Sequence, residues 1–439
     1  MLEPEAPAAL RTRLSIMMFL QYAIWGAWLP ILYPFLMGHR HFTLDQTGSV
    51  LAAGAVGAIF GPFIAGQLAD RAFATERLLA VSHFIGAILV WFLAMTDSFP
   101  VFLALSLLYG LIYAPTLALT NSLAFAHLPN RDRDFGPVRL WGTIGWIVAG
   151  ILIGQLLLRV HTPANAADEV VAAAQNAGRA DAFRLSSALG VVMALYCLTL
   201  PHTPPTKNAR EQIAFAEAMG EIVKQPLITL FLLAVPVSMI HQFYFVYTSQ
   251  FVSNVQTQSA RAGEFAKSIN EVLGVGGGGL MTIGQMAELA VLALMPILAT
   301  KLSRKTLLAI GLMAYAGRMA LFAYAPSIGP VILGIALHGL CFGCFVFVAF
   351  MVVDEFTSKD VRATAQNLFN LVIVGIGIIV GSWFATSIVG RYATVKAADG
   401  TESLDFVRLF SVPMWMALAC LVVLLVAYPS RGATKPAGS

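Results

Sequence analysis

The chain has 439 residues, of which 58% are hydrophobic and only 11% are charged, and its mean hydropathy is +0.77. A water-soluble domain carries about a quarter charged residues. This composition therefore excludes an ordinary soluble enzyme or binding domain and indicates a protein embedded in lipid. The formal net charge of +4 is small, and the distribution of Lys and Arg between loops is more informative than their sum.

Apolar stretches long enough to cross a bilayer, which takes about 20 residues, recur along the whole chain and predict twelve transmembrane helices. We expect these helices at residues 14–36, 48–68, 77–96, 100–125, 137–158, 183–200, 227–252, 278–300, 305–324, 330–353, 364–390 and 406–428. The first stretch is longer than a signal-peptide core and lacks an A-x-A-like cleavage signal, so it is predicted to be retained.

The polar segment 201–226 lies at the middle of the chain and divides six helices from six. The predicted fold class is thus an all-α membrane protein with two pseudo-symmetric six-helix bundles, residues 1–200 and 227–439, joined by a cytoplasmic loop at 201–226. Most Lys and Arg residues fall on the inner side if both termini are cytoplasmic, as the positive-inside rule requires.

A short internal repeat supports two related halves. Residues 68–71, Leu-Ala-Asp-Arg, follow the second predicted helix, and residues 298–301, Leu-Ala-Thr-Lys, follow the eighth. Arg139 at the start of the fifth helix corresponds to Arg362 near the start of the eleventh. Paired repeats with a binding site at their interface are a common plan of transporters.

The motif Gly66-x-Leu-Ala-Asp70-Arg71 resembles the loop signature of the major facilitator superfamily (MFS). There, Asp70 and Arg71 would make a gating contact that forms in one conformation and breaks in the other. The alternative is a charge pair that only sets topology.

A more specific resemblance, to the nucleoside:proton symporter family within that superfamily, extends along nearly the whole chain. It rests on residues 19–28 (FLQYAIWGAW), 139–145 (RLWGTIG), 198–202 (LTLPH), 285–288 (QMAE), 318–324 (RMALFAY) and 362–366 (RATAQ). Members of this family are bacterial permeases that import nucleosides with protons.

The resemblance implies an MFS fold, a multi-pass protein of the bacterial inner membrane, and a single-chain carrier. Its partners would be a nucleoside, protons and the lipid bilayer, with no cofactor, metal or nucleic acid. The alternatives are an MFS carrier for a sugar or other small polar solute, a facilitator without proton coupling, or a receptor that binds without transporting. A membrane enzyme is disfavoured because the sequence has no H-E-x-x-H or G-x-S-x-G motif.

Glu288 is the one acidic residue that we place near the middle of an apolar stretch. A charged carboxylate there costs at least a few kcal/mol, so it must face a cavity, find a partner or hold a proton. We therefore predict that Glu288 couples proton movement to transport, with a structural ion pair as the alternative.

Arg139, Thr143 and Trp146 stand at i, i+4 and i+7 and so share one face of the fifth predicted helix. A guanidinium and a hydroxyl can bind carbonyl or ribose oxygens, and an aromatic ring can stack on a base. The resemblance implies the same, because these positions match substrate-contacting positions of the family. In the alternative interpretation, Trp146 packs and Arg139 extends toward the cytoplasmic surface.

In the second half, Gln242 and Phe245 in the seventh helix and Gln285 and Glu288 in the eighth form two i, i+3 pairs. The two glutamine amides and the carboxyl group of Glu288 can form hydrogen bonds with ribose hydroxyls. All four residues are predicted to bind substrate. A single glutamine in a membrane helix is as often a bond between helices.

His338 and Phe342 share a face of the tenth helix and are also predicted to bind substrate, with Gly343 next to them. The sequence departs from the family here, which carries Tyr, Phe and Asp at these three positions and Asn at Phe245. His338 could compensate for these differences as a hydrogen-bond donor or a proton carrier. Alternatively, it could be a structural histidine whose hydrogen bonds are made between helices.

Arg318 in the ninth helix is a further buried cation, which we expect to point toward a helix end or toward Asp354 or Glu355. Gln21 and Trp25 share a face of the first helix, for packing or for lining the cavity. The four cysteines lie in apolar stretches, and Cys341-x-x-Cys344 lacks two further ligands, so we predict no metal site.

Overall fold

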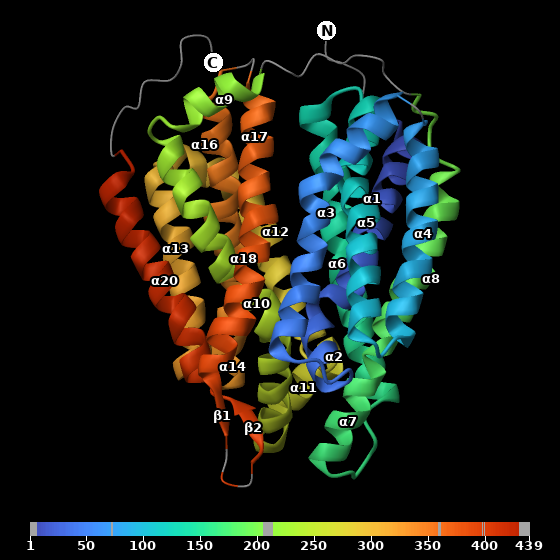
Figure 1. Ribbon diagram of the computed structural model, residues 1–439, viewed down its shortest axis with the longest axis vertical. Coiled ribbons are helices and arrows are strands. Elements are labelled where there is room, and N and C mark those ends of the chain that lie inside the picture. Colours follow the sequence, from blue (N-terminus) through green and yellow to red (C-terminus); the bar gives the residue numbers. More distant parts are fainter. Residues whose placement is uncertain are drawn as a thin grey trace. The chain divides into compact units, whose positions relative to one another are not determined.

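The structure is a computed structural model that describes residues 7–71, 73–204, 214–358, 361–396, 398 and 400–429. For residues 58, 62–71, 132, 214–216, 262, 264 and 363 it describes the backbone alone. Each of the twelve predicted stretches is helical (Figure 1). Eleven spans among the described residues are long and apolar enough to cross a membrane. The other long helix is α3 (Leu44–Arg71), whose 28 residues also suffice.

The first six spans are mostly continuous helices. Span one comprises α1 (Ala8–Trp28), the 3-10 segment η1 (Leu29–Ile31) and α2 (Leu32–Gly38), and α3 follows as span two. The next four are α4 (Thr75–Met95), α5 (Phe99–His127), α6 (Arg131–Val160) and α8 (Ala180–Cys197). The 3-10 segment coincides with Pro30, which has no N–H to donate to the helix.

The last six spans are interrupted more often. Spans seven to nine are α10 (Leu227–Ala262), α12 (Gly278–Lys301) and α13 (Arg304–Tyr324). Span ten comprises α14 (Ile328–Ala336), α15 (His338–Leu340), the π-helical η2 (Cys341–Phe347) and α16 (Val348–Phe356). Span eleven comprises α17 (Arg362–Asn370), η3 (Leu371–Ile376), α18 (Gly377–Trp383), η4 (Phe384–Gly390) and α19 (Arg391–Ala393), and span twelve is α20 (Phe406–Ala427).

Short elements that we did not predict lie between the spans. They are the helices α7 (Asp168–Gly178), α9 (Ala214–Ile222) and α11 (Glu264–Leu273), and an antiparallel pair of strands, β1 (Thr394–Lys396) and β2 (Glu402–Leu404). Each has between 3 and 11 residues, so a search for apolar stretches of about 20 residues does not detect them.

Local chemistry explains several helix starts. Asn130 caps α6 by accepting from the backbone N–H of Arg133, and Ser303 caps α13 by accepting from that of Thr306. Asp405 accepts from two backbone N–H groups at the start of α20. These side chains satisfy donors that a helix N-terminus leaves unpaired.

Large apolar side chains on the outer spans are exposed, as expected for helices that face lipid. On α4, Val81 is 56% exposed and Phe92 is 51% exposed. On α20, Trp415 is 64% exposed and Val426 is 81% exposed. Such surfaces would be costly in water.

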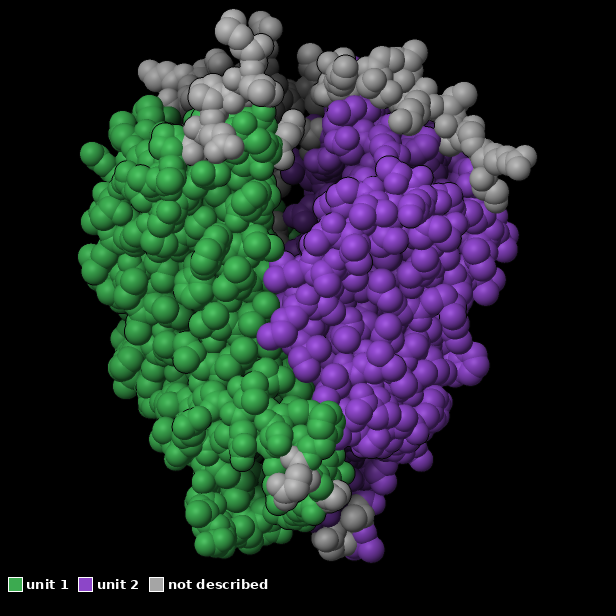
Figure 2. All heavy atoms as spheres, turned by 180° about the vertical axis from the view of Figure 1, so that it is seen from behind, with its two compact units in different colours: residues 1–208, 252–282 green, residues 209–251, 283–439 purple. Residues whose placement is uncertain are grey.

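The structure divides into two compact units, which Figure 2 colours separately. Unit 1 comprises residues 1–208 and 252–282, and unit 2 comprises residues 209–251 and 283–439. Segment 252–282 thus packs with the first half of the chain although it follows the predicted division. Val275 donates its backbone N–H to the Gly154 carbonyl on α6 at 3.1 Å, and the Gln155 amide donates to the carbonyl of Val272 at 3.0 Å.

Within unit 1, the first six spans pack in three pairs: α1 with α6, α3 with α5, and α4 with α8. Glycine permits the closest contacts. A Cβ on Gly57 would lie 2.0 Å from the carbonyl oxygen of Gly110, and one on Gly145 would lie 2.2 Å from that of Phe19. Small residues allow helix backbones to approach in this way.

Unit 2 repeats the same three pairings among its own spans. Span seven packs on span eleven, where Ser238 donates to the carbonyl of Ile373 and Tyr247 donates to that of Ala385. Span eight contacts span ten, where Gly339 lies against the backbone of Ala287. Span nine packs on span twelve as α13 on α20. The internal repeat seen in the sequence therefore has a counterpart in the packing of each half.

Candidate functional site

The predicted stripe of α6 is present in unit 1. Arg139, Thr143 and Trp146 are all partly exposed. The Arg139 guanidinium lies 4.0 Å from the ring centroid of Tyr22 on α1, in cation–π geometry. The indole of Trp146 meets that of Trp25 edge to face, with centroids 6.0 Å apart. Arg139 is thus held against an aromatic ring within the unit.

A close approach of α1 to α6 positions this stripe. A Cβ on Gly26 would lie 2.8 Å from the Cα of Trp146, and one on Gly142 would lie 2.6 Å from the Tyr22 ring. Two glycines, one on each helix, therefore let the aromatic side chains on α1 and the stripe on α6 interleave.

Gln21 is fully buried in a hydrogen-bonded cluster, which favours the packing interpretation for this residue. Its Nε2 donates to the Thr116 hydroxyl at 2.8 Å, and its Oε1 lies 2.8 Å from His83 Nε2. Tyr113 donates its hydroxyl to the Gln21 carbonyl. Our sequence interpretation missed His83, although a titratable residue inside an apolar stretch is a sufficient signal.

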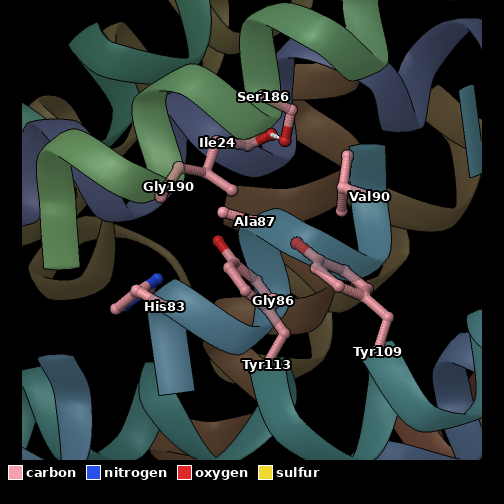
Figure 3. A pocket seen from close by; sticks show the side chains of 9 residues that line it. All are labelled: Ile24, His83, Gly86, Ala87, Val90, Tyr109, Tyr113, Ser186 and Gly190. Carbon is pink, nitrogen blue, oxygen red and sulfur yellow. Dashed lines mark hydrogen bonds between the residues drawn. The ribbon is translucent and has the colours of Figure 1, made fainter. Parts of the chain in front are cut away.

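A small cavity lies beside this cluster (Figure 3). Its lining includes His83, Tyr109, Tyr113 and Ser186, and Ser186 donates its hydroxyl to the carbonyl of Ile24 at 2.8 Å. The cavity measures about 10 Å³, which is room for one water molecule at most. It is therefore too small to be a substrate site.

In unit 2, Gln242 and Phe245 lie on α10 and differ in their surroundings. Gln242 is buried, and its Nε2 donates to the Ser382 hydroxyl on α18 at 2.9 Å. Its amide thus links spans seven and eleven. Phe245 is partly exposed and its ring contacts that of His241, with centroids 5.2 Å apart.

Gln285 on α12 is 8% exposed, and its Oε1 has no hydrogen-bond partner among the residues that the structure describes. An unpaired buried acceptor costs about 1–3 kcal/mol. Such a cost is expected at a binding site, because a bound ligand can supply the hydrogen-bond donor that the acceptor lacks.

Glu288 lies one turn after Gln285 and meets His338 of α15. Glu288 Oε2 is 3.7 Å from His338 Nε2, and their side chains are 16% and 3% exposed. On its other side, His338 Nδ1 is 3.2 Å from a terminal nitrogen of Arg318 on α13. Three separate spans thus contribute to one line of polar groups.

Aromatic rings enclose this line. Tyr244 stacks on the His338 ring with centroids 4.8 Å apart, and the Arg318 guanidinium lies 4.4 Å from the centroid of the same tyrosine. His241 Nδ1 is 2.7 Å from the hydroxyl of Tyr315, whose ring is also close to Arg318. The sequence pattern did not reveal this aromatic enclosure.

The expectation that Arg318 points toward Asp354 or Glu355 is wrong. Glu355 pairs with Arg304 and Asp354 pairs with Arg362, whereas Arg318 is fully buried beside His338. Asp354 and Glu355 lie at the end of α16, whereas Arg318 lies in the middle of α13. The two acids therefore pair with the closer cations, Arg362 and Arg304.

Two further predicted site residues are only partly placed. Phe342 lies on the π-helical segment η2 and is partly exposed; π-helical turns are frequent at functional sites. Asp70 and Arg71 are the last residues of α3, but their side chains lie outside the described part of the chain, so the predicted gate contact stays a prediction.

Comparison with known proteins gives an independent view of the chain. The family model described as "Nucleoside H+ symporter" matches residues 8–431. A relative from Escherichia coli (strain K12), the putative nucleoside transporter YegT, is 32% identical over 84% of this chain and 82% of its own length. Nucleoside permease NupG from the same organism is 25% identical over 89% of this chain and 90% of its own length.

A crystal structure of nucleoside transporter NupG matches with a TM-score of 0.78 at 23% identity and covers 96% of this chain and all of that one. At this identity the match supports the fold. A crystal structure of a D-xylose-proton symporter matches with a TM-score of 0.66, so the architecture is that of the major facilitator transporters. These relatives are transporters rather than enzymes. The chain is a multi-pass membrane protein that belongs to the nucleoside H+ symporter family.

Proposed function

We propose that this protein imports nucleosides by proton symport with alternating access. Membership of the nucleoside H+ symporter family carries the proposal. Its site chemistry agrees, because the partly exposed carboxylate of Glu288 lies one helical turn from the unpaired acceptor of Gln285. The pair offers a proton-binding group and a group that can accept from a hydroxyl.

Substrate-binding residues are proposed in each half of the chain. On α6, Trp146 would stack on the base, and Arg139 and Thr143 would bind its carbonyl groups or the ribose. In the second half, the substrate-binding residues would be Gln242, Phe245, Gln285, Glu288, His338 and Phe342. Gln242 would have to share its amide between substrate and Ser382.

Glu288 is proposed to carry the coupling proton. Burial in a largely apolar span disfavours the charged form of a carboxyl group, and a change in solvent access during transport changes that cost. Asp70 and Arg71 are proposed to form and break a gate contact during the same cycle. We further propose cytoplasmic termini, a bacterial inner-membrane location and a monomeric carrier.

The test is uptake of labelled uridine into proteoliposomes, with and without an inward proton gradient, for the wild type and Glu288→Gln. We expect the gradient to stimulate uptake by the wild type and not by the variant. Absence of all nucleoside uptake would refute the proposed substrate. Uptake that responds to neither the gradient nor the substitution would refute only the coupling.

A sugar carrier is the second candidate. Maltose permease from Geobacillus stearothermophilus is 22% identical over 97% of this chain. In addition, Phe245 and Gly343 differ from the residues expected at these positions in the nucleoside:proton symporter family. Competition of uridine uptake by maltose, xylose and unlabelled nucleosides separates the two. Only nucleosides should compete.

A further inference from the structure

The line Glu288–His338–Arg318 in unit 2 restricts the protonation state of its central histidine. A guanidinium has only donors, so at 3.2 Å the terminal nitrogen of Arg318 must donate to Nδ1 of His338. Nδ1 is then an acceptor without its own proton. The single proton of the neutral ring therefore lies on Nε2, the nitrogen that faces Glu288.

A second proton on His338 would be unfavourable in this position. It would turn Nδ1 into a donor facing the Arg318 donor and would place two cations together in a site where His338 is 2% exposed and Arg318 is fully buried. The Glu288 carboxylate lies at Nε2, on the other side of the ring, so it does not relieve the contact between two donors at Nδ1. This geometry favours a neutral His338 and leaves Glu288 as the member of the line that can change charge.

Among the described residues, the charged or titratable groups beside His338 come from three neighbouring helices: Glu288 on α12, Arg318 on α13, and His241 and Tyr244 on α10. Tyr315 on α13 and Cys341 on η2 lie near Arg318. Glu288 is the one carboxylate in this group, and Arg318 is the one permanent cation.

We propose that His338 is a positioning residue for Glu288: held in one tautomer by Arg318, it presents its Nε2–H to the carboxylate and sets the pH range in which Glu288 takes up a proton. This inference rests on the proposed symport, in which Glu288 carries the coupling proton.

The proposed step moves a single proton. An external proton converts the Glu288 carboxylate to the neutral acid, and His338 keeps its own proton throughout. The 3.7 Å separation is longer than a hydrogen bond, so the proposal requires the Glu288 carboxyl group to move closer to Nε2 when it is charged. Because the Nε2–H favours the charged carboxylate, its removal should let Glu288 protonate at higher pH.

Two substitutions that differ by one methylene test this role. His338→Gln places an amide near the position of Nε2 and keeps a donor for Glu288, whereas His338→Asn places it near Nδ1 and keeps only the contact with Arg318. Infrared difference spectra of the reconstituted protein follow protonation of Glu288 over pH, and Glu288→Gln identifies its band. This measurement needs no substrate.

We expect His338→Asn to raise the midpoint of Glu288 protonation by about one pH unit, the size expected for loss of one donor to a carboxylate. His338→Gln should restore a midpoint close to that of the wild type. The matched control is His241→Gln, which alters a histidine of the same cluster whose Nδ1 lies near Tyr315. This control should leave the midpoint unchanged.

Equal midpoints in the Asn and Gln variants would overturn the proposal, as would an equal shift in the His241 control. Uridine uptake by the same samples is a separate readout. If the wild type transports no uridine but the infrared midpoints shift as expected, the proposed function fails and the positioning role stands. If uptake is proton-driven and the midpoints do not differ, the positioning role alone fails.

Discussion

The backbone of Gly339 lies so close to that of Ala287 that a Cβ on the glycine would fall 2.5 Å from the Ala287 carbonyl carbon. These residues are the neighbours of His338 and Glu288. The glycine therefore permits the approach of spans eight and ten that brings the histidine and the carboxylate together.

Gly339→Ala should separate these two spans and reduce proton-driven uptake at least tenfold, because the added methyl has backbone rather than a flexible side chain in its way. We expect a stability loss of about 1–3 kcal/mol, seen as a lower Tm in detergent. Gly329→Ala in the same span is the control, since a Cβ there meets nothing within 4 Å. Wild-type uptake by Gly339→Ala would show that the close contact is not needed.

Gln285→Leu should weaken substrate binding without destabilising the protein. The substitution removes a buried acceptor that lacks a partner among the described residues, so the free energy of unfolding should stay constant or rise by up to about 1 kcal/mol. We expect KM for uridine to rise about tenfold, which corresponds to about 1.4 kcal/mol of binding energy. A large fall in Tm with unchanged KM would assign Gln285 a structural role instead.

Trp146→Leu should cost about 5- to 150-fold in uridine affinity, as expected from the loss of a base stack worth about 1–3 kcal/mol. Trp146→Phe keeps an aromatic plane and should retain most of the affinity. Trp25→Phe is a useful control because it changes the ring that packs against Trp146 edge to face. If Leu and Phe at position 146 behave alike, stacking on this residue does not contribute.

Arg318→Lys should destabilise the protein although it keeps the charge. The planar guanidinium lies over the rings of Tyr244 and Tyr315, and an ammonium group cannot stack in the same way. We expect a loss of about 1–3 kcal/mol, measured by thermal unfolding. The control is Arg304→Lys in the partly exposed pair with Glu355, which should change stability by less than about 1 kcal/mol.

The residues around Glu288 illustrate how far the sequence could lead. A lone carboxylate in an apolar stretch is costly wherever that helix lies, so Glu288 stood out before any partner was known. Its contact with His338 could not be predicted in the same way. That contact depends on how spans eight and ten turn about their own axes and how closely Gly339 lets them approach.

Gln21 and Gln242 make the same point. Each shares a helical face with an aromatic residue, and the sequence left both a substrate role and a packing role open. The structure places Gln21 against His83 and Thr116, and it bonds Gln242 to Ser382. Neither set of partners is near in sequence.

The sequence by itself determined the twelve spans, their order and the family to which they point, because the free energy of burying an apolar stretch in lipid is a local property. Only the tertiary structure decided that Arg318 meets His338 rather than Asp354 or Glu355, and that segment 252–282 packs with the first half. Pairing between distant side chains depends on the rotation and spacing of whole helices, and hydropathy contains no information about either.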